Sequence, residues 1–344
     1  MIKVYLFTIL TYLFLMNSCE NSSDLALYKK SGVVFDRIML IEADEEGGFL
    51  CPYLLYIPDK LKTMAAPAKI LVIPNNSGKT NDSDDWHLTR AIEDMKRYSL
   101  PADQENQRVI LMPVFPRYSS INGGYKIYTH ALDRDSLVSP LAKGKIERID
   151  VQLINMLNHA RNLLAAEAGI SFDFRVIMFG FSASAHFADR FTLLYPRQVQ
   201  ALVIGGFNGH IALPLAQYNG MDLIYPVGIY DYAELTESAF DYQSYKAIPK
   251  LFFMGAHDTN DDVSFSDGYD EPERKLIYAL LGEVRKNDFV SQRIAPLKAI
   301  LEEQGLMENR IFKIYENTGH EISSAMIKDI EKFMNEAHMD EVDY

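Results

Sequence analysis

Hydrophobic and polar residues follow two kinds of pattern along the chain. Short apolar runs that are bounded by proline, glycine or polar turn residues predict buried strands. These runs lie at residues 33–41, 53–57, 69–73, 108–114, 174–179, 201–204, 251–254 and 311–315. Longer stretches with apolar residues every three or four positions predict helices. These stretches lie at residues 89–98, 147–168, 183–195, 286–304 and 322–337.

The alternation of strands and helices predicts the fold class. A strand that is apolar throughout must be covered on both faces of its sheet. Strands that alternate with helices are joined by crossovers and therefore pair in parallel. We expect an α/β fold with a mostly parallel central sheet, helices on both faces and an antiparallel edge from the earliest strands. Such sheets bind ligands beyond the carboxyl ends of their strands, so the polar residues there are the candidate functional residues.

The first eighteen residues form a separate unit. Lys3 precedes an apolar run at residues 4–16, and the small residue Ser18 stands directly before Cys19. This pattern predicts an export signal rather than a membrane-spanning helix. The Ser18-Cys19 pair resembles a bacterial lipobox, in which the cysteine is lipidated and becomes the mature N-terminus. A plain signal peptide that is cut nearby, or an uncleaved anchor, is the alternative.

We therefore expect a signal peptide at residues 1–18, a polar tether at 19–32 and a single domain at 33–344. A lipidated Cys19 would hold the protein in the cell envelope, and the membrane contact would be through this lipid only. Cys51 is the one other cysteine, so no internal disulfide could form and the fold would depend on its core. We expect Cys51 to be a small buried hydrophobic residue.

Charge and motif spacing exclude several kinds of partner and cofactor. The net charge is −13, which argues against nucleic-acid binding because that needs a basic surface. The stretch Gly78-Lys79-Thr80 lacks the earlier glycine of a phosphate-binding loop, because position 73 is isoleucine. An EF-hand loop that began at Asp258 would need glycine and glutamate where Val263 and Tyr269 stand. We expect no metal ion and no cofactor.

The candidate nucleophile is Ser182. It lies in Gly180-Phe181-Ser182-Ala183-Ser184, where a predicted strand runs directly into a predicted helix. A serine in such a sharp turn presents its oxygen above the sheet, and the turn needs small residues two positions before and after it. Gly180 and Ser184 meet this need, although the common pattern G-x-S-x-G has glycine in the last place. The N–H of Ala183, at the start of the helix, is a candidate oxyanion donor.

A serine nucleophile needs a base, and His320 is the best placed histidine. It follows the last predicted strand, on a loop that precedes the final helix, whereas His159 and His186 fall within predicted helices. An acid that orients the imidazole is expected at the end of another late strand. Asp258 stands closest to such an end. The competing residues on the same loop are Asp261 and Asp262.

The order Ser182, Asp258, His320 resembles the α/β-hydrolase superfamily over roughly residues 33–338. This resemblance implies the α/β-hydrolase fold and acyl transfer through an acyl-serine, followed by hydrolysis. It also implies a second oxyanion donor on the loop after an early strand, where the backbone N–H of Asn76 or Ser77 is the candidate. Two stretches at about residues 207–249 and 262–285 are expected to be lid-like insertions. The tyrosines of the first either stack on substrate rings or pack inside the insertion.

The resemblance favours a secreted, lipid-anchored carboxylesterase that acts on a small-molecule or glycan-linked ester. A serine peptidase is the second hypothesis, because the same three residues can cleave amides. A lipoprotein that uses the fold only to bind a ligand is the third, since fold alone does not determine function.

Overall fold

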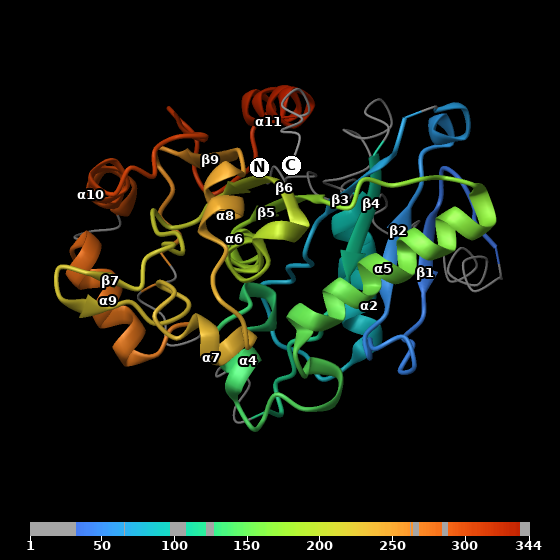
Figure 1. Ribbon diagram of the computed structural model, residues 1–344, viewed down its shortest axis with the longest axis horizontal. Helices are drawn as coiled ribbons and strands as arrows, with labels where there is room; N and C mark the ends of the chain where they lie inside the picture. The colour runs from blue at the N-terminus through green and yellow to red at the C-terminus, as the bar shows by residue number, and fades with distance from the viewer. Residues whose placement is uncertain are drawn as a thin grey trace, which may run out of the picture.

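Eight strands form one sheet at the centre of the molecule (Figure 1). The computed structural model describes residues 32–64, 66–96, 108–121, 127–261, 263, 268–283 and 288–337. The strands are β1 (Ile38–Ile41), β2 (Tyr53–Tyr56), β3 (Lys69–Val72), β4 (Arg108–Pro113), β5 (Val176–Phe181), β6 (Val199–Gly205), β9 (Lys250–Gly255) and β10 (Arg310–Tyr315).

The order of strands across the sheet is β1-β2-β4-β3-β5-β6-β9-β10. Strand β2 pairs antiparallel with β1 and β4. The other neighbouring pairs are parallel. This arrangement confirms the predicted sheet, which is mostly parallel and has an antiparallel edge formed by the earliest strands.

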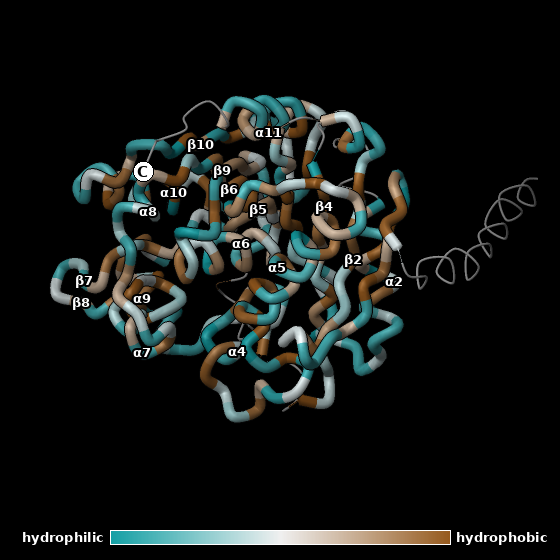
Figure 2. The backbone as a smooth tube through the Cα atoms, turned by 45° about the vertical axis from the view of Figure 1, so that its right-hand side comes forward, coloured by the Kyte–Doolittle hydropathy of each residue, from teal (hydrophilic) through white to brown (hydrophobic). Residues whose placement is uncertain are grey.

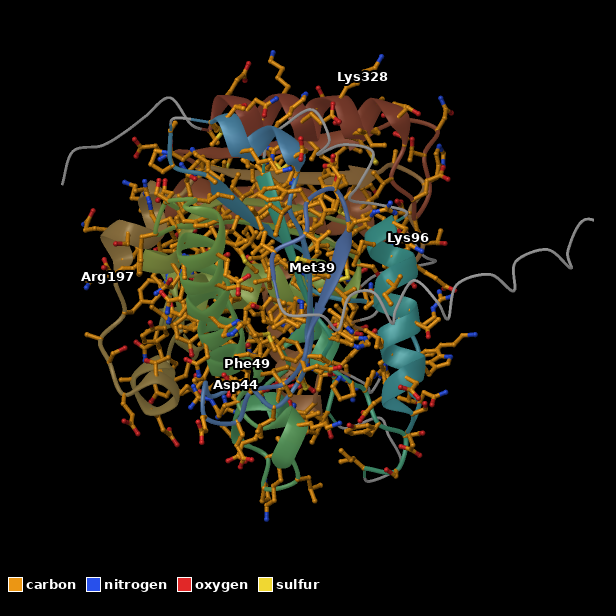
Figure 3. The ribbon with its side chains drawn as sticks, turned by 90° about the vertical axis from the view of Figure 1, so that its right-hand side faces the viewer. Met39, Asp44, Phe49, Lys96, Arg197 and Lys328 are labelled. Atoms are coloured by element: carbon orange, nitrogen blue, oxygen red, sulfur yellow. The ribbon has the colours of Figure 1, made fainter. Side chains whose placement is uncertain are left out.

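Helices cover both faces of the sheet. Helices α5 (Ile149–Ala168) and α6 (Ala183–Leu194) pack on one face, and α2 (Asp84–Asp94) and α11 (Ser324–Glu336) pack on the other. Figure 3 looks onto the β1 edge of the sheet, with α5 and α2 on opposite sides of it. Strand β3 shows the division, because Ile70 and Val72 enter the core beside α5 while Leu71 enters the core beside α2. Successive side chains of a strand point to opposite faces.

The central strands are hydrophobic because they are buried on both faces. Figure 2 shows hydrophobic residues along the strands of the sheet, and every residue of β6 and β9 is buried. Cys51 is also buried and unpaired, and burial raises the pKa of its thiol. In the part of the chain that the structure describes, no helix has the length and hydropathy that a bilayer span requires. The predicted signal peptide and Cys19 lie outside the described residues.

The remaining elements lie in the connections between the strands. They are η1 (Asp59–Thr63), η3 (Thr129–Ala131), α4 (Asp135–Val138), η4 (Gly144–Ile146), η5 (Pro196–Gln198), the hairpin of β7 (Gln217–Tyr218) and β8 (Met221–Asp222), α7 (Tyr232–Thr236), α8 (Tyr242–Ala247), α9 (Glu271–Leu281) and α10 (Phe289–Glu303). Within the stretch 207–249, Tyr225, Tyr232 and Tyr245 are buried, whereas Tyr230 is exposed. The three buried rings belong to the main core, where the hydroxyls of Tyr225 and Tyr232 donate to Leu132 O and Leu194 O. A lid role for either insertion stays a prediction.

Three of the larger elements differ from the sequence expectation. Helix α2 begins five residues earlier than predicted, because the hydroxyl of Ser83 accepts a hydrogen bond from Trp86 N–H and caps a polar first turn. Strand β1 begins only at Ile38, since Asp36 adopts a φ of 52° that interrupts an extended chain. Helix α9 was not expected. The sequence feature that marks its start is the capping box formed by Asp270 and Glu273. The other bounds differ from expectation by three residues or fewer.

Candidate active site

The three predicted catalytic residues follow the carboxyl ends of β5, β9 and β10. Ser182 comes directly after β5, Asp258 comes three residues after β9, and His320 comes five residues after β10. These strands lie in the same half of the sheet, in the order β5-β6-β9-β10, and run parallel. Their carboxyl ends therefore meet at one edge, which is where ligands bind to sheets of this kind.

Ser182 lies on a sharp turn between β5 and α6. Its φ of 61° and ψ of −129° are values that residues with a side chain rarely adopt. The turn is so tight that a Cβ on Gly180 would overlap the carbonyl of Ser184. The N–H of Ser182 donates to Gly205 O at 2.9 Å, which holds the turn against the end of β6. The predicted elbow is thus present, and its first small residue has to be glycine.

Ser184 has a function that its size alone did not reveal. Its Oγ accepts a hydrogen bond from Phe181 N–H at 3.0 Å and donates one to Phe181 O at 2.9 Å. The hydroxyl therefore ties together the two sides of the elbow, which a glycine in this place could not do. Compared with the glycine of the common pattern, the serine in this last position adds two hydrogen bonds to the turn.

Asp258 and His320 are in direct contact. His320 Nδ1 lies 2.9 Å from Asp258 Oδ2, and the aspartate side chain is 1% exposed. The other oxygen of this carboxylate accepts a hydrogen bond from Asn260 N–H at 2.9 Å. With Nδ1 protonated and bonded to the carboxylate, Nε2 is the basic nitrogen of a neutral imidazole. This is the arrangement that a general base requires.

The loops that carry this pair are joined along their backbones. His257 N–H donates to Thr318 O at 2.9 Å. A Cβ on Gly255 would overlap the carbonyl oxygens of Thr318 and Gly319. Glycine at the end of β9 therefore lets the loop of His320 pass directly over the loop of Asp258.

The imidazole of His320 also lies beside the elbow. Its ring packs on that of Phe181, with 4.8 Å between the ring centroids. Its Cε1 would lie 3.0 Å from a Cβ on Gly206. Among the described residues, no hydrogen bond joins Ser182 Oγ to the imidazole, and Nε2 lies 3.1 Å from Asn260 Nδ2. Hydrogen bonds of catalytic groups are often formed only once substrate is bound.

Asp261, the competitor of Asp258, has a different partner. Its two carboxylate oxygens accept hydrogen bonds from Arg293 Nη1 and Nη2 at 2.6 and 3.0 Å. The structure therefore brings Asp258 to the imidazole and directs Asp261 toward α10. The other competitor, Asp262, lies outside the described residues.

The loop after β3 reaches the elbow from the other side. Asn76 Nδ2 donates to Phe181 O at 3.2 Å, so the predicted oxyanion loop touches the residue before Ser182. The loop is held in turn by Asn75, whose side chain bonds both the N–H and the C=O of Phe115 at 3.1 and 3.0 Å. The N–H of Ala183 is the first of α6 and has no acceptor within the helix. Asn76 and Ala183 therefore flank the position of Ser182.

Comparison with known proteins identifies the fold. No protein-family model and no curated protein matches the sequence. A solved structure of poly(aspartic acid) hydrolase-1 from Sphingomonas sp. KT-1 is similar, with a TM-score of 0.53, 17% identity and coverage of 86% of this chain and 96% of that one. The chain has the α/β-hydrolase fold.

Two further solved structures are similar to this chain. A poly(3-hydroxybutyrate) depolymerase from Bordetella parapertussis has a TM-score of 0.48 and 16% identity, with coverage of 87% of this chain and 89% of that one. An S-formylglutathione hydrolase from Agrobacterium tumefaciens has a TM-score of 0.46 and 13% identity, with coverage of 87% and 94%. The strand order of the sheet and the likeness to the first structure show the fold.

The α/β-hydrolase fold buries other histidines, among them His130 and His210. Burial lowers the pKa of His130 to about 3 and holds that of His210 well below its ordinary value. His159 bonds the hydroxyl of Tyr53 at 2.7 Å. Among the described residues, no three His, Cys, Asp or Glu side chains are grouped as they would be around a metal ion.

Sequence reasoning missed three residues that shape this edge of the α/β-hydrolase fold. Asn75 holds the predicted oxyanion loop, and Asn260 contacts the imidazole. Arg293 binds Asp261. Asn75 stands beside a residue that was predicted, and Asn260 follows Asp258 by two positions. Arg293 carried no local signal, because it lies in the middle of a helix.

Proposed function

We propose that the protein is a serine hydrolase that cleaves carboxylic esters through an acyl-serine intermediate. In this proposal Ser182 is the nucleophile, His320 is the general base and Asp258 orients the imidazole. The observation that carries the proposal is the 2.9 Å contact between His320 Nδ1 and Asp258 Oδ2 beside an elbow in which Ser182 has a φ of 61°. A hydrogen bond between Asp258 and His320 that served only the fold would not require a strained serine at the neighbouring elbow.

The proposed reaction begins when Ser182 Oγ attacks the carbonyl carbon of the ester. His320 Nε2 takes the hydroxyl proton, and Asp258 stabilises the imidazolium that forms. The Asn260 amide, now 3.1 Å from Nε2, gives way to the Ser182 hydroxyl in this step. The N–H of Ala183 and a backbone N–H of Asn76 or Ser77 bind the negative oxygen of the tetrahedral intermediate.

The intermediate then collapses with transfer of the proton from His320 to the leaving alcohol. A water molecule attacks the acyl-serine, with His320 again as base, and releases the acid and the free enzyme. An ester is the proposed substrate because its alcohol leaves more readily than the amine of an amide. Substrate is proposed to be a small-molecule or glycan-linked ester.

The proposed location is the cell envelope, with Cys19 lipidated and residues 1–18 removed. Support comes from the Lys3 start, the apolar run at 4–16 and the small residue before the cysteine. A membrane-held esterase would meet substrates outside the cytoplasm. No nucleic-acid partner is proposed, in keeping with the net charge of −13.

The decisive experiment is labelling with a fluorophosphonate, which reacts with activated serines. We expect the purified protein to be labelled at Ser182, and Ser182→Ala to abolish labelling. Removal of His320 or Asp258, in His320→Ala and Asp258→Asn, should lower kcat for an ester by at least about 10³-fold. Ser238→Ala is the matched control, because Ser238 is exposed on the insertion.

A panel of acyl esters and aminoacyl amides then tests the substrate class. Faster turnover of esters supports the proposal, and faster turnover of amides would replace it with a peptidase. Folded protein without any Ser182-dependent labelling would overturn the enzymatic proposal and favour a ligand-binding lipoprotein.

A further inference from the structure

Arg293 is buried where two loops of the candidate site meet. It lies on α10, far from the three predicted catalytic residues in sequence, and its side chain has no exposed surface. Its guanidinium contacts Asp261 on the loop that carries Asp258. It also donates from Nη1 to Asn208 O at 3.0 Å, on the loop that follows β6. One side chain therefore joins both loops.

The first of these loops holds the acid. Asp258 and Asp261 are separated by a tight turn, in which Asn260 N–H bonds the Asp258 carboxylate and Asp261 N–H donates to Thr259 O at 3.0 Å. A planar guanidinium that binds both carboxylate oxygens fixes the orientation of its partner as well as its distance. Arg293 thus restrains the turn that carries Asp258.

The second loop faces the imidazole. Gly206, Asn208 and Gly209 all have positive φ values, of 60°, 57° and 68°, a conformation that is strained only at Asn208, the one residue of the three with a side chain. A Cβ on Gly209 would lie 2.8 Å from Arg293 Cβ, and a Cβ on Gly206 would lie 3.0 Å from His320 Cε1. The loop therefore runs from contact with His320 to contact with Arg293 within four residues.

We propose that Arg293 is a positioning residue, which through Asp261 and Asn208 O holds the Asp258 loop and the Gly206 loop on either side of the His320 imidazole. This inference rests on the proposed function and adds to it a residue that touches neither substrate nor the reacting atoms. Without the hydrogen bonds of Arg293 to Asp261 and Asn208 O, the substrate site stays in place. The His320–Asp258 pair, however, moves away from its catalytic position. A displacement of about 1 Å can cost 10²-fold in rate.

The test compares Arg293→Lys and Asp261→Asn with the wild-type protein. Lysine keeps the charge but cannot bind two carboxylate oxygens and a carbonyl together. Asparagine keeps the shape of Asp261, which is 12% exposed, and removes its charge. In both variants we expect kcat and the rate of fluorophosphonate labelling to fall by roughly 10- to 100-fold, with KM changed by no more than about twofold.

Arg310→Lys is the matched control. Arg310 is also a buried arginine that donates to a backbone carbonyl, that of Glu308. It stands at the amino end of β10, whereas the candidate site lies at the carboxyl ends of the strands. We expect this variant to lose thermal stability and to keep the wild-type kcat. A loss of kcat in Arg310→Lys equal to that in Arg293→Lys would show a general packing effect and overturn the inference.

The outcomes separate this inference from the proposed function. Wild-type protein that shows no Ser182-dependent labelling would refute the hydrolase itself. Folded Arg293→Lys and Asp261→Asn proteins that are labelled at the wild-type rate would refute only the positioning role. A rise in KM with unchanged kcat would also refute it, because Arg293 would then act on substrate binding. If Arg293→Lys does not fold, Asp261→Asn decides the question alone.

Discussion

Gly255, at the end of β9, lies directly against the backbone of the loop that carries His320. A Cβ in this place would overlap backbone oxygens of both Thr318 and Gly319, and neither can turn aside as a flexible side chain could. We predict that Gly255→Ala separates the two loops and lowers kcat by about 100-fold or more. Steady-state kinetics and circular dichroism on the purified variant would measure the loss and show that the protein is still folded.

Gly220→Ala provides the comparison for this prediction. Gly220 has a positive φ, of 76°, which Gly255 does not, and a Cβ there would meet no atom within 4 Å. The substitution therefore strains the β7–β8 turn without moving any loop of the candidate site. Equal kcat values for Gly255→Ala and wild type would refute the close-approach argument.

Helix α9 begins with a buried carboxyl group. Glu273 is 2% exposed and forms a capping box with Asp270. Burial, which is the largest cause, raises its pKa to about 8 from 4.5. The unfolded chain loses this proton near pH 4.5, whereas the folded protein keeps it up to about pH 8. Between these values the unfolded state binds fewer protons, so the stability falls as pH rises, by up to about 1.4 kcal/mol per pH unit.

We predict that Glu273→Gln removes this decline. Glutamine keeps the capping box but does not titrate. The free energy of unfolding of the variant, relative to wild type, should therefore rise between pH 4.5 and pH 8 in urea titrations. Glu302→Gln, at an exposed position of α10, should show no such trend. A Glu273→Gln protein with the wild-type pH dependence would show that this carboxyl is ionised in the folded state.

The proposed anchor and the candidate site belong to different parts of the chain. Strand β1 forms one edge of the sheet and β10 the other, so the chain that follows the tether enters at the edge opposite the strand before His320. We predict that Cys19→Ser releases the protein from the detergent phase in a partition assay on expressing cells, whereas the wild type stays in it. Because the site is built from later residues, kcat/KM should stay within about twofold of wild type. A Cys19→Ser protein that still partitions with detergent would refute lipidation at this position.

Much of the architecture followed from local patterns. The apolar runs and helical spacing predicted the strands and helices of the sheet, because burial on two faces demands uniform hydrophobicity. The elbow at Ser182 was predictable because a strand, a tight turn and a helix follow one another within a few residues. The polar first turn of α2 and the whole of α9 escaped the same reasoning, because both helices begin at capping residues rather than at apolar residues of helical spacing.

By itself, the sequence determined the alternation of elements and the order Ser182, Asp258, His320, since both depend on periodicity and turn residues that lie close together in the chain. Only the tertiary structure decided that Asp258 meets His320 while Asp261 pairs with Arg293. It alone also joined Asn76 to the elbow through Phe181. These contacts join residues that are 32 to 105 positions apart. The physical reason is that strand order and close backbone packing bring such distant residues together. Neither property can be inferred from a short stretch of sequence.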